Sequence, residues 1–255
     1  MPWALFGSAL LATELAWIWL PFQAVLAWLF TRGGALDSGL GSFAMFVLAV
    51  TWVGLAWSIW MSTRAEAAVE NGLASGLGYN YRREIPLSVQ SNLRQEVRFR
   101  DWKNPLAMRR PDVEVIRHIP YGPAGVRQQL DIYRPRVIPP QGCPVLLQIH
   151  GGAWMMGDKG GQALPLMYEL ASRGWICVAA NYRLSPSVSF PTHLHDCKEA
   201  LCWVRINGRE YGMNPDFVAV TGGSAGGHLT ALMGLTANRP ELQPGHPDID
   251  TSVQA

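Results

Sequence analysis

Two long apolar runs occupy most of the first sixty positions. Residues 3–30 contain one charged side chain, Glu14, and residues 40–61 contain none. A helix that crosses a membrane needs about 20 apolar residues, and such helices tolerate a proline like Pro21. The pattern therefore predicts two transmembrane helices over residues 3–30 and 40–61, joined by the polar residues 31–39 as a hairpin.

Two other interpretations of this region stay open. A cleaved secretory signal needs a basic start, which residues 1–4 lack, and a shorter apolar core. A buried helical hairpin of a soluble protein is the other alternative.

The positions of the arginines predict how the membrane segment is oriented. Arg64, Arg82 and Arg83 follow the second apolar run. Only Arg32 lies between the two runs. The two apolar runs predict a multi-pass membrane protein. The positive-inside rule then predicts that the domain after the second run lies on the cytoplasmic side.

Beyond residue 112 the pattern changes to short apolar runs that alternate with amphipathic segments. Three runs are apolar on both faces, as central strands of a parallel sheet are when helices cover both sides. They are residues 144–150, 175–181 and 217–221. Residues 113–119 and 129–133 predict a hairpin. Helices are expected at residues 163–173, 192–209 and 224–238. This order predicts a doubly wound, mostly parallel α/β fold over residues 113–255.

Charge is uneven along the chain. The formal net charge is +2, and residues 64–112 hold nine Arg and Lys against six Asp and Glu. This basic segment predicts a linker whose arginines rest on anionic lipid, or equally a cap over the following domain. Residues 113–255 are neutral, with eleven charges of each sign. A nucleic-acid partner is not expected, because phosphate contacts need a basic face.

Gly222-Gly-Ser-Ala-Gly226 follows the third apolar strand and precedes a helix. A nucleophilic serine stands on such a sharp strand-to-helix turn, where the strained backbone leaves little room for side chains on either side. The helix N-terminus also favours the negative charge that develops on a substrate. Glycine-rich turns can bind nucleotides instead, but the strand and helix around this one favour Ser224 as a nucleophile.

His150-Gly-Gly-Ala-Trp154 comes directly after the apolar strand that ends at residue 149. Ester hydrolysis passes through a tetrahedral oxyanion, which preorganised backbone N–H groups stabilise. Small residues after a strand let the backbone approach a substrate carbonyl, and the N–H of Ala225 would complete such an oxyanion hole. Taken alone, this motif is equally compatible with a tight turn that ends a strand.

The two motifs in this order resemble the branch of the α/β-hydrolases related to hormone-sensitive lipase. They are similar to carboxylesterases of the mycobacterial Lip type, and the resemblance covers residues 113–255. It implies an α/β-hydrolase fold, no cofactor, and a small-molecule or lipid ester as substrate. The apolar N-terminal helices would attach such an enzyme to a membrane.

The resemblance also implies a role for each motif residue. Ser224 is the expected nucleophile. The expected oxyanion-hole residues are Gly151, Gly152, Ala153 and Ala225, and the expected supporting residues are His150, Gly222 and Gly226. Ala153 stands where many relatives have a third glycine, but its N–H remains. No metal site is expected, and four cysteines without a C-x-x-C pair predict no disulfide framework.

A general base and its acidic partner do not emerge from these motifs. The family order is Ser, then Asp or Glu, then His, each on a loop after a later strand. His193, His195 and Asp196 precede Ser224, and Asp196 is interpreted as a charge or cap at a helix start. His228 is interpreted as structural. His246 lies in a Pro/Gly-rich tail that leaves no room for a later strand.

These observations predict that the chain is the N-terminal part of a longer protein. Residues 217–221 are apolar on both faces, and such a strand needs neighbours on both sides. Residues 251–255 also look like the opening of another strand. Without the triad Asp and His, a serine is a weak nucleophile. The fragment by itself is therefore expected to be nearly inactive.

Two alternatives to an esterase remain. Related enzymes with the His-Gly-Gly loop are amidases or formamidases. The plant gibberellin receptors resemble the same branch and bind a ligand without catalysis, after losing the catalytic histidine. The sequence of a downstream segment, with or without an Asp and a His on post-strand loops, would separate enzyme from receptor.

Overall fold

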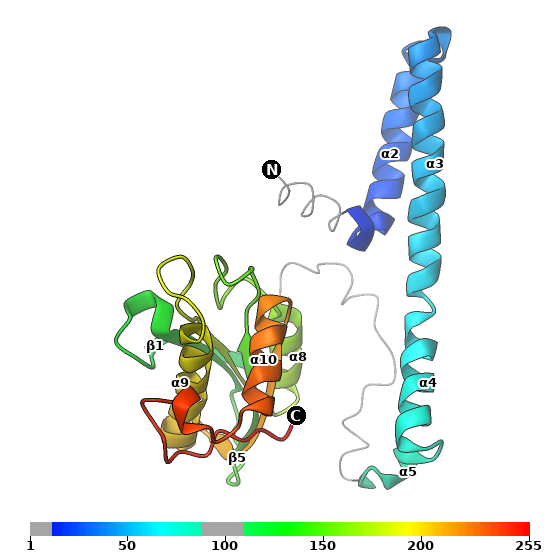
Figure 1. Ribbon diagram of the computed structural model, residues 1–255. Helices are drawn as coiled ribbons and strands as arrows, with labels where there is room; N and C mark the ends of the chain where they lie inside the picture. Colours follow the sequence, from blue (N-terminus) through cyan, green and yellow to red (C-terminus); the bar gives the residue numbers. More distant parts are fainter. Residues whose placement is uncertain (1–11, 88–109) are drawn as a thin grey trace. The chain divides into compact units, whose positions relative to one another are not determined.

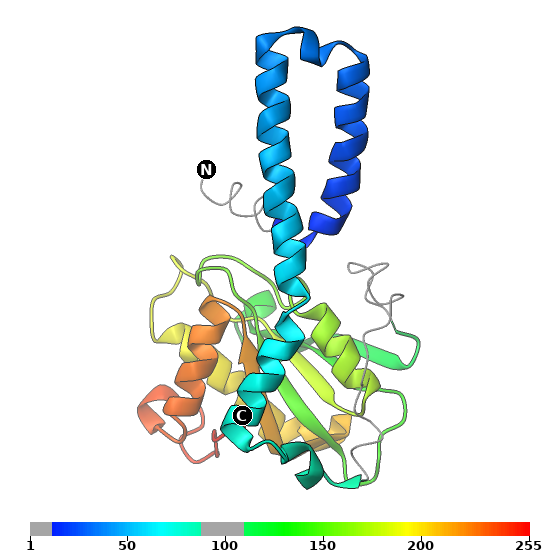
Figure 2. The ribbon, with the colours of Figure 1, turned by 90° about the vertical axis from the view of Figure 1, so that its right-hand side faces the viewer.

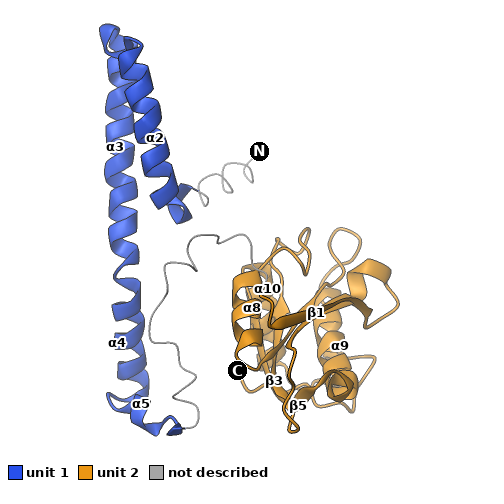
Figure 3. Ribbon diagram, turned by 180° about the vertical axis from the view of Figure 1, so that it is seen from behind, with its two compact units in different colours: residues 1–93 blue, residues 94–255 orange. Residues whose placement is uncertain are grey.

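The computed structural model describes residues 12–87 and 110–255, which fall in two compact units, residues 1–93 and 94–255 (Figure 3). Predictions for residues 3–11 and 88–109 lie outside the described residues. The first unit is helical, and the second is a sheet covered by helices (Figure 1).

The helical unit is an antiparallel hairpin of α2 (Ala16–Arg32) and α3 (Gly39–Ser62), joined by the short 3-10 helix Ala35–Asp37 (Figure 2). The side chain of Ser38 caps α3 by accepting a hydrogen bond from Gly41 N at 3.0 Å. Trp52 Nε1 donates to Gln23 Oε1 at 3.0 Å and links the two helices. The predicted helical hairpin is therefore present in the described part of this region.

Large apolar side chains on both helices face outward. Phe30, Leu40, Phe46 and Val53 are each more than 60% exposed. Within the described residues, the helical stretch Gly39–Leu77 is long and apolar enough to cross a membrane. That stretch comprises α3 and the next helix, α4 (Ala65–Leu77). The first predicted span is described only from residue 12, so a two-span arrangement stays a prediction.

The expected linker begins as helix. It forms α4 (Ala65–Leu77) and the single turn α5 (Tyr81–Glu84). Alanine and glutamate favour helix in α4, and Arg82 Nη2 pairs with Glu70 at 2.7 Å to fold α5 back on it.

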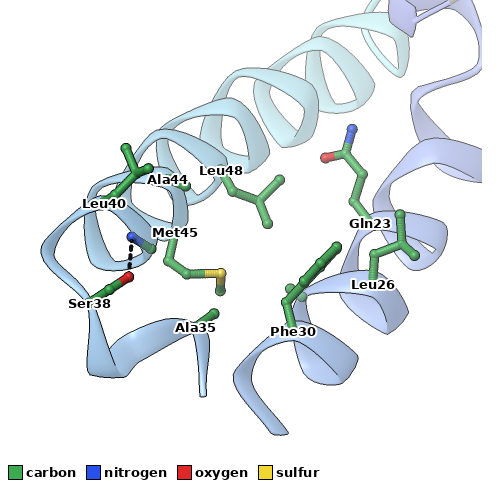
Figure 4. A pocket seen from close by; sticks show the side chains of 11 residues that line it. Gln23, Leu26, Phe30, Ala35, Ser38, Leu40, Ala44, Met45 and Leu48 are labelled. Carbon is green, nitrogen blue, oxygen red and sulfur yellow. Dashed lines mark hydrogen bonds between the residues drawn. The ribbon is translucent and has the colours of Figure 1, made fainter. Parts of the chain in front are cut away.

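An apolar cavity of about 550 Å³ lies between α2 and α3 near their connection (Figure 4). Leu26, Phe30, Met45 and Leu48 supply much of its lining. Gln23 also borders it, with its side-chain oxygen engaged by Trp52. The cavity therefore presents hydrocarbon and no charged group.

The second unit contains one five-stranded sheet in the order β1-β2-β4-β3-β5. Its strands are β1 (Val113–Pro120), β2 (Gln129–Pro135), β3 (Cys143–Ile149), β4 (Ile176–Ala180) and β5 (Met213–Gly222). β3 pairs in parallel with β4 and β5, whereas β2 is antiparallel to both β1 and β4. The sheet is therefore mixed, although four of its strands share one direction, as expected for a mostly parallel fold.

Helices cover both faces of this sheet, as the doubly apolar strands predicted. They are α8 (Leu164–Ser172), α9 (Thr192–Asn207) and α10 (Ala225–Leu235). Alternate residues of β3 point to opposite faces: Val145 and Leu147 pack with α9 and α10, and Leu146 packs with α8. The remaining short 3-10 turns are Gly125–Gln128, Gly208–Tyr211 and Pro240–Leu242.

The last residues of the chain lie along the edge of β5 that does not face β3. Gln254 N donates to Val218 O at 2.9 Å, and Val220 N donates to Ala255 O at 2.8 Å. Thr251 is buried and its N–H donates to Asn238 Oδ1 at 2.7 Å. The segment expected to open another strand is thus hydrogen-bonded to β5.

Candidate active site

Ser224 occupies the turn between β5 and α10. Its φ of 53° and ψ of −121° lie in a region that non-glycine residues rarely adopt. The side chain is exposed and forms no hydrogen bond to the part of the chain that the structure describes. A strained, solvent-facing hydroxyl at the start of a helix matches the geometry expected of a nucleophile.

The glycines around Ser224 allow three backbone segments to meet. A Cβ on Gly226 would lie 2.8 Å from His150 O and nearer still to Ile149 O. A Cβ on Gly222 would lie 2.5 Å from the carbonyl carbon of Gly226. The end of β3 therefore packs directly on the turn that carries Ser224, and only glycine fits at these two positions.

The expected oxyanion loop lies beside Ser224. A Cβ on Gly151 would be 3.3 Å from the Ser224 Cβ. Gly152 and Ala153 have φ of 128° and 51°. Ala153 thus adopts a left-handed conformation that glycine favours. Among the described residues, no acceptor pairs with the N–H groups of Gly152, Ala153 or Ala225.

Gly151 differs from the other three expected oxyanion-hole residues. Its N–H donates to Gln162 Oε1 at 2.8 Å, and Gln162 Nε2 donates back to Gly151 O at 3.3 Å. The N–H of Gly151 is therefore already used, and this residue shapes the loop instead of contributing a donor. Gln162, which the sequence motifs did not identify, holds that peptide in place.

We expect Gln162→Leu to destabilise the second unit by about 1–3 kcal/mol, because the N–H of Gly151, a buried residue, loses its acceptor. Gln162→Glu keeps the acceptor and should lose less. Urea unfolding monitored by circular dichroism measures both. Equal stability of Gln162→Leu and the unmodified chain would show that solvent replaces this side chain fully.

His150 is buried under the loop, with its ring stacked on Tyr182 at 4.4 Å between centroids. Tyr182 OH donates to His150 O at 2.9 Å, and His150 Nδ1 donates to Gly151 O at 2.9 Å. Burial is the main cause that lowers the pKa of His150 below its ordinary value of 6.5. A neutral His150 thus supports the oxyanion loop from beneath.

The lowered pKa of His150 predicts a pH dependence of stability. The unfolded chain binds a proton near pH 6.5, whereas the folded chain resists it. The free energy of unfolding should therefore fall as pH drops below about 6.5, and His193 and His195, whose pKa values burial also lowers, act in the same direction. Urea unfolding between pH 8 and 5 measures this, and His150→Asn should flatten the dependence. A stability independent of pH over that range would contradict the prediction.

Comparison with known proteins shows which proteins this chain is similar to. Residues 130–254 match the family model described as BD-FAE. Esterase LipQ of Mycobacterium tuberculosis is 41% identical over 199 residues, which are 77% of this chain and 47% of that protein. The probable carboxylic ester hydrolase LipM of the same organism is 55% identical over 138 residues, 54% of this chain and 32% of that protein. These matches support the hormone-sensitive-lipase-like esterase/lipase family for this chain.

Solved structures agree with this family. A phosphonate-inhibited esterase B from Lactobacillus rhamnosis superposes with a TM-score of 0.50 at 31% identity, over 61% of this chain and 50% of that one. The mixed sheet with helices on both faces is therefore an α/β-hydrolase fold. The chain spans less than half the length of the two mycobacterial relatives described above.

The side chains of three histidines contact groups other than the Ser224 hydroxyl. His228 meets the edge of Trp154 at 5.3 Å between ring centroids, so it joins α10 to the oxyanion loop. His246 Nε2 pairs with Glu199 Oε1 at 2.9 Å. His193 Nε2 lies 3.1 Å from Ser185 Oγ. Among the described residues, no histidine side chain is hydrogen-bonded to the Ser224 hydroxyl, and the backbone N–H of His228 donates to Ser224 O at 3.0 Å within the first turn of α10.

Asp196 corrects one interpretation. It lies within α9, is 1% exposed, and does not cap the helix, which begins after Pro191. Arg183 Nη2 donates to Asp196 Oδ1 at 2.6 Å, and Gln128 Nε2 donates to the same oxygen at 2.8 Å. A carboxylate this deeply buried needs such partners. Asp196 therefore fixes the segment after β4 to the helix.

The cysteines and possible metal ligands add no chemistry here. The four cysteines are buried and form no disulfide. Burial raises the pKa of Cys177 to about 12, so this thiol stays protonated. Across residues 12–87 and 110–255, no group of three His, Cys, Asp or Glu side chains is placed to hold a metal ion.

Proposed function

We propose that the whole protein is a serine carboxylesterase in which Ser224 is the nucleophile. The observation that carries this proposal is the strained, exposed Ser224 beside the N–H groups of Gly152, Ala153 and Ala225, which have no acceptor among residues 12–87 and 110–255. The similarity to proteins named esterases supports the reaction type.

In this proposal, Ser224 Oγ attacks the carbonyl carbon of an ester and its proton passes to a general base. The carbonyl oxygen becomes an oxyanion and accepts hydrogen bonds from the three N–H groups. One such donor contributes about 10²–10³ in rate. When the intermediate collapses, its bond to the alkoxy oxygen breaks, that oxygen takes the proton back from the base and leaves as the alcohol, and an acyl-enzyme remains on Ser224. Water then hydrolyses the acyl-enzyme by the same steps.

We further propose that the base and its acidic partner come from residues other than those described. In support, the Ser224 hydroxyl forms no hydrogen bond to a histidine side chain within the described residues, and the relatives are about twice as long as the aligned region or more. The 255-residue chain alone should then hydrolyse esters only slowly, because a serine without its base keeps a small residual rate.

The proposed substrates are small-molecule or lipid esters, and the proposed location is a membrane. The apolar outer surface of α2 and α3 supports insertion of both helices. The arginines that follow α3 support a cytoplasmic position for the hydrolase unit. An enzyme anchored beside a bilayer would meet apolar esters at high local concentration.

A fluorophosphonate probe tests the role of Ser224. The whole protein should be labelled on the peptide that carries Ser224, as identified by mass spectrometry, and should hydrolyse p-nitrophenyl butyrate. An N-formyl arylamide assayed in parallel separates an esterase from a formamidase. A protein that is neither labelled nor active, yet binds apolar esters in equilibrium dialysis, would instead be a ligand-binding member of the family.

A further inference from the structure

The oxyanion loop holds a backbone conformation that needs support from outside. Between Gly151 and Lys159, four residues have positive φ: Gly152, Ala153, Trp154 and Gly157. For the two that are not glycine, this conformation is unfavourable, and it persists only where the surrounding structure enforces it. Hydrogen bonds within the loop are few, with Met155 and Met156 donating to Gly152 O.

Lys159 ends this loop as a buried cation. Its side chain is 3% exposed, and Nζ lies 2.9 Å from Oδ1 of Asp131, which is 1% exposed. Asp131 belongs to β2, two strands away from β3 in the sheet. The ion pair therefore fastens the end of the loop to a different strand from the one on which the loop begins.

The partners of Asp131 leave no carboxylate oxygen unpaired. His118 N donates to Oδ1 at 2.9 Å, and Arg117 Nη1 donates to Oδ2 at 3.1 Å. Lys159 Nζ also lies 3.2 Å from His118 Nδ1. The Asp131 carboxylate therefore holds three donors, from Lys159, Arg117 and the backbone of His118, in a fixed arrangement.

Side-chain hydrogen bonds from Asn181, which follows β4, and from Arg127 hold the same end of the loop. Lys159 N donates to Asn181 Oδ1 at 2.7 Å, and Asn181 Nδ2 donates to Asp158 Oδ2 at 3.2 Å. Arg127 Nη1 donates to Gly157 O at 3.0 Å. These contacts fix the backbone of residues 157–159. The ion pair in addition fixes the position of the Lys159 side chain against β2.

We propose that the buried Lys159–Asp131 ion pair positions the oxyanion loop, so that its loss weakens transition-state binding more than substrate binding. Both residues are positioning residues and neither touches the substrate. The kinetic part of this proposal rests on the proposed esterase function. The structural part, that the pair holds residues 150–162 in place, does not.

The structural test is hydrogen exchange with mass spectrometry on the full chain. In Lys159→Met and Asp131→Asn, amides in residues 150–162 should exchange at least about tenfold faster, while those of β3 and α10 stay protected. Lys198→Met is a matched control, because Lys198 is also fully buried but donates to Thr236 O at the end of α10. It should leave exchange in residues 150–162 unchanged.

The double variant D131N/K159M separates positioning from charge compensation. Removing Asp131 alone leaves Lys159 as a buried charge without its carboxylate, whereas removing both partners does not. The double variant should therefore melt closer to the unmodified protein than Asp131→Asn does, yet still show fast exchange in residues 150–162. Restored protection in the double variant, or unchanged protection in both single variants, would overturn the proposal.

The kinetic test uses the whole protein with p-nitrophenyl butyrate. The double variant should lose about 10–100-fold in kcat with KM within about twofold, since small displacements of oxyanion donors reduce the rate by such factors. An unchanged kcat, or a loss confined to KM, would overturn the kinetic part. If the unmodified protein itself shows no hydrolysis that depends on Ser224, the proposed function fails, and the exchange experiment still decides whether the pair positions the loop.

Discussion

Ser224→Ala should reduce ester hydrolysis by the whole protein by about 10⁴–10⁶-fold, the range found when a serine nucleophile is removed from a hydrolase. The loss should fall on kcat, because the acyl-enzyme cannot form, while binding of the substrate depends on other groups. Steady-state kinetics with p-nitrophenyl butyrate measures both constants. The melting temperature should change little, because Ser224 is exposed and makes no side-chain hydrogen bond within the described residues.

Ser172→Ala is the matched control for this substitution. Ser172 ends α8 and its hydroxyl accepts a hydrogen bond from Arg110 Nη1 at 2.8 Å, on an element that does not carry the nucleophile. Its removal should leave kcat unchanged. Hydrolysis that survives Ser224→Ala would show that another residue attacks the ester and would remove the basis of the proposed mechanism.

Gly226→Ala is expected to destabilise the hydrolase unit by about 3 kcal/mol or more. The added methyl group would overlap the carbonyl oxygens of Ile149 and His150, and both belong to the backbone at the end of β3. Backbone atoms cannot rotate away from the added methyl group as a side chain could. The overlap must therefore displace the backbone, which lowers the free energy of unfolding. Urea unfolding of the 255-residue chain measures this effect without any need for activity.

Gly223→Ala provides the comparison within the same turn. A Cβ at Gly223 meets no atom within 4 Å. Its substitution should alter the free energy of unfolding by no more than about 0.5 kcal/mol, as for other open surface positions. Similar losses for the two variants would mean that the turn is more adaptable than its contacts indicate.

The sequence predicted the strands best where burial dictates composition. β3, β4 and β5 each lie between two layers of helix, so their residues are apolar on both faces and stand out from the rest of the chain. The hairpin predicted over residues 113–119 and 129–133 is confirmed, because β1 and β2 pair antiparallel. The antiparallel pairing of β2 with β4 could not be predicted, because alternation of apolar residues is the same in a strand of either direction.

The motif residues were recognisable because their chemistry requires a local pattern. Glycines around Ser224 and after His150 are needed for close backbone approach, and both patterns are contiguous in sequence. Gln162, Asp131 and Asn181 act across long separations and belong to no contiguous pattern. Asp131 between Leu130 and Ile132 was the one signal in the sequence, because a carboxylate at a buried strand position needs a partner. The sequence does not indicate that this partner is Lys159.

The order of the strands also governs when the site can form during folding. β1 and β2 are neighbours in sequence and can pair as a hairpin. β3 and β5 pair across a long stretch of sequence, which contains α8, β4 and α9. Pairings between distant segments form slowly, in milliseconds to seconds for sheets dominated by them. Ser224 therefore meets Gly151 only when the most distant pairing of the sheet is made. The contact between the Ser224 turn and the loop after β3 should therefore be among the last features that a refolding molecule acquires.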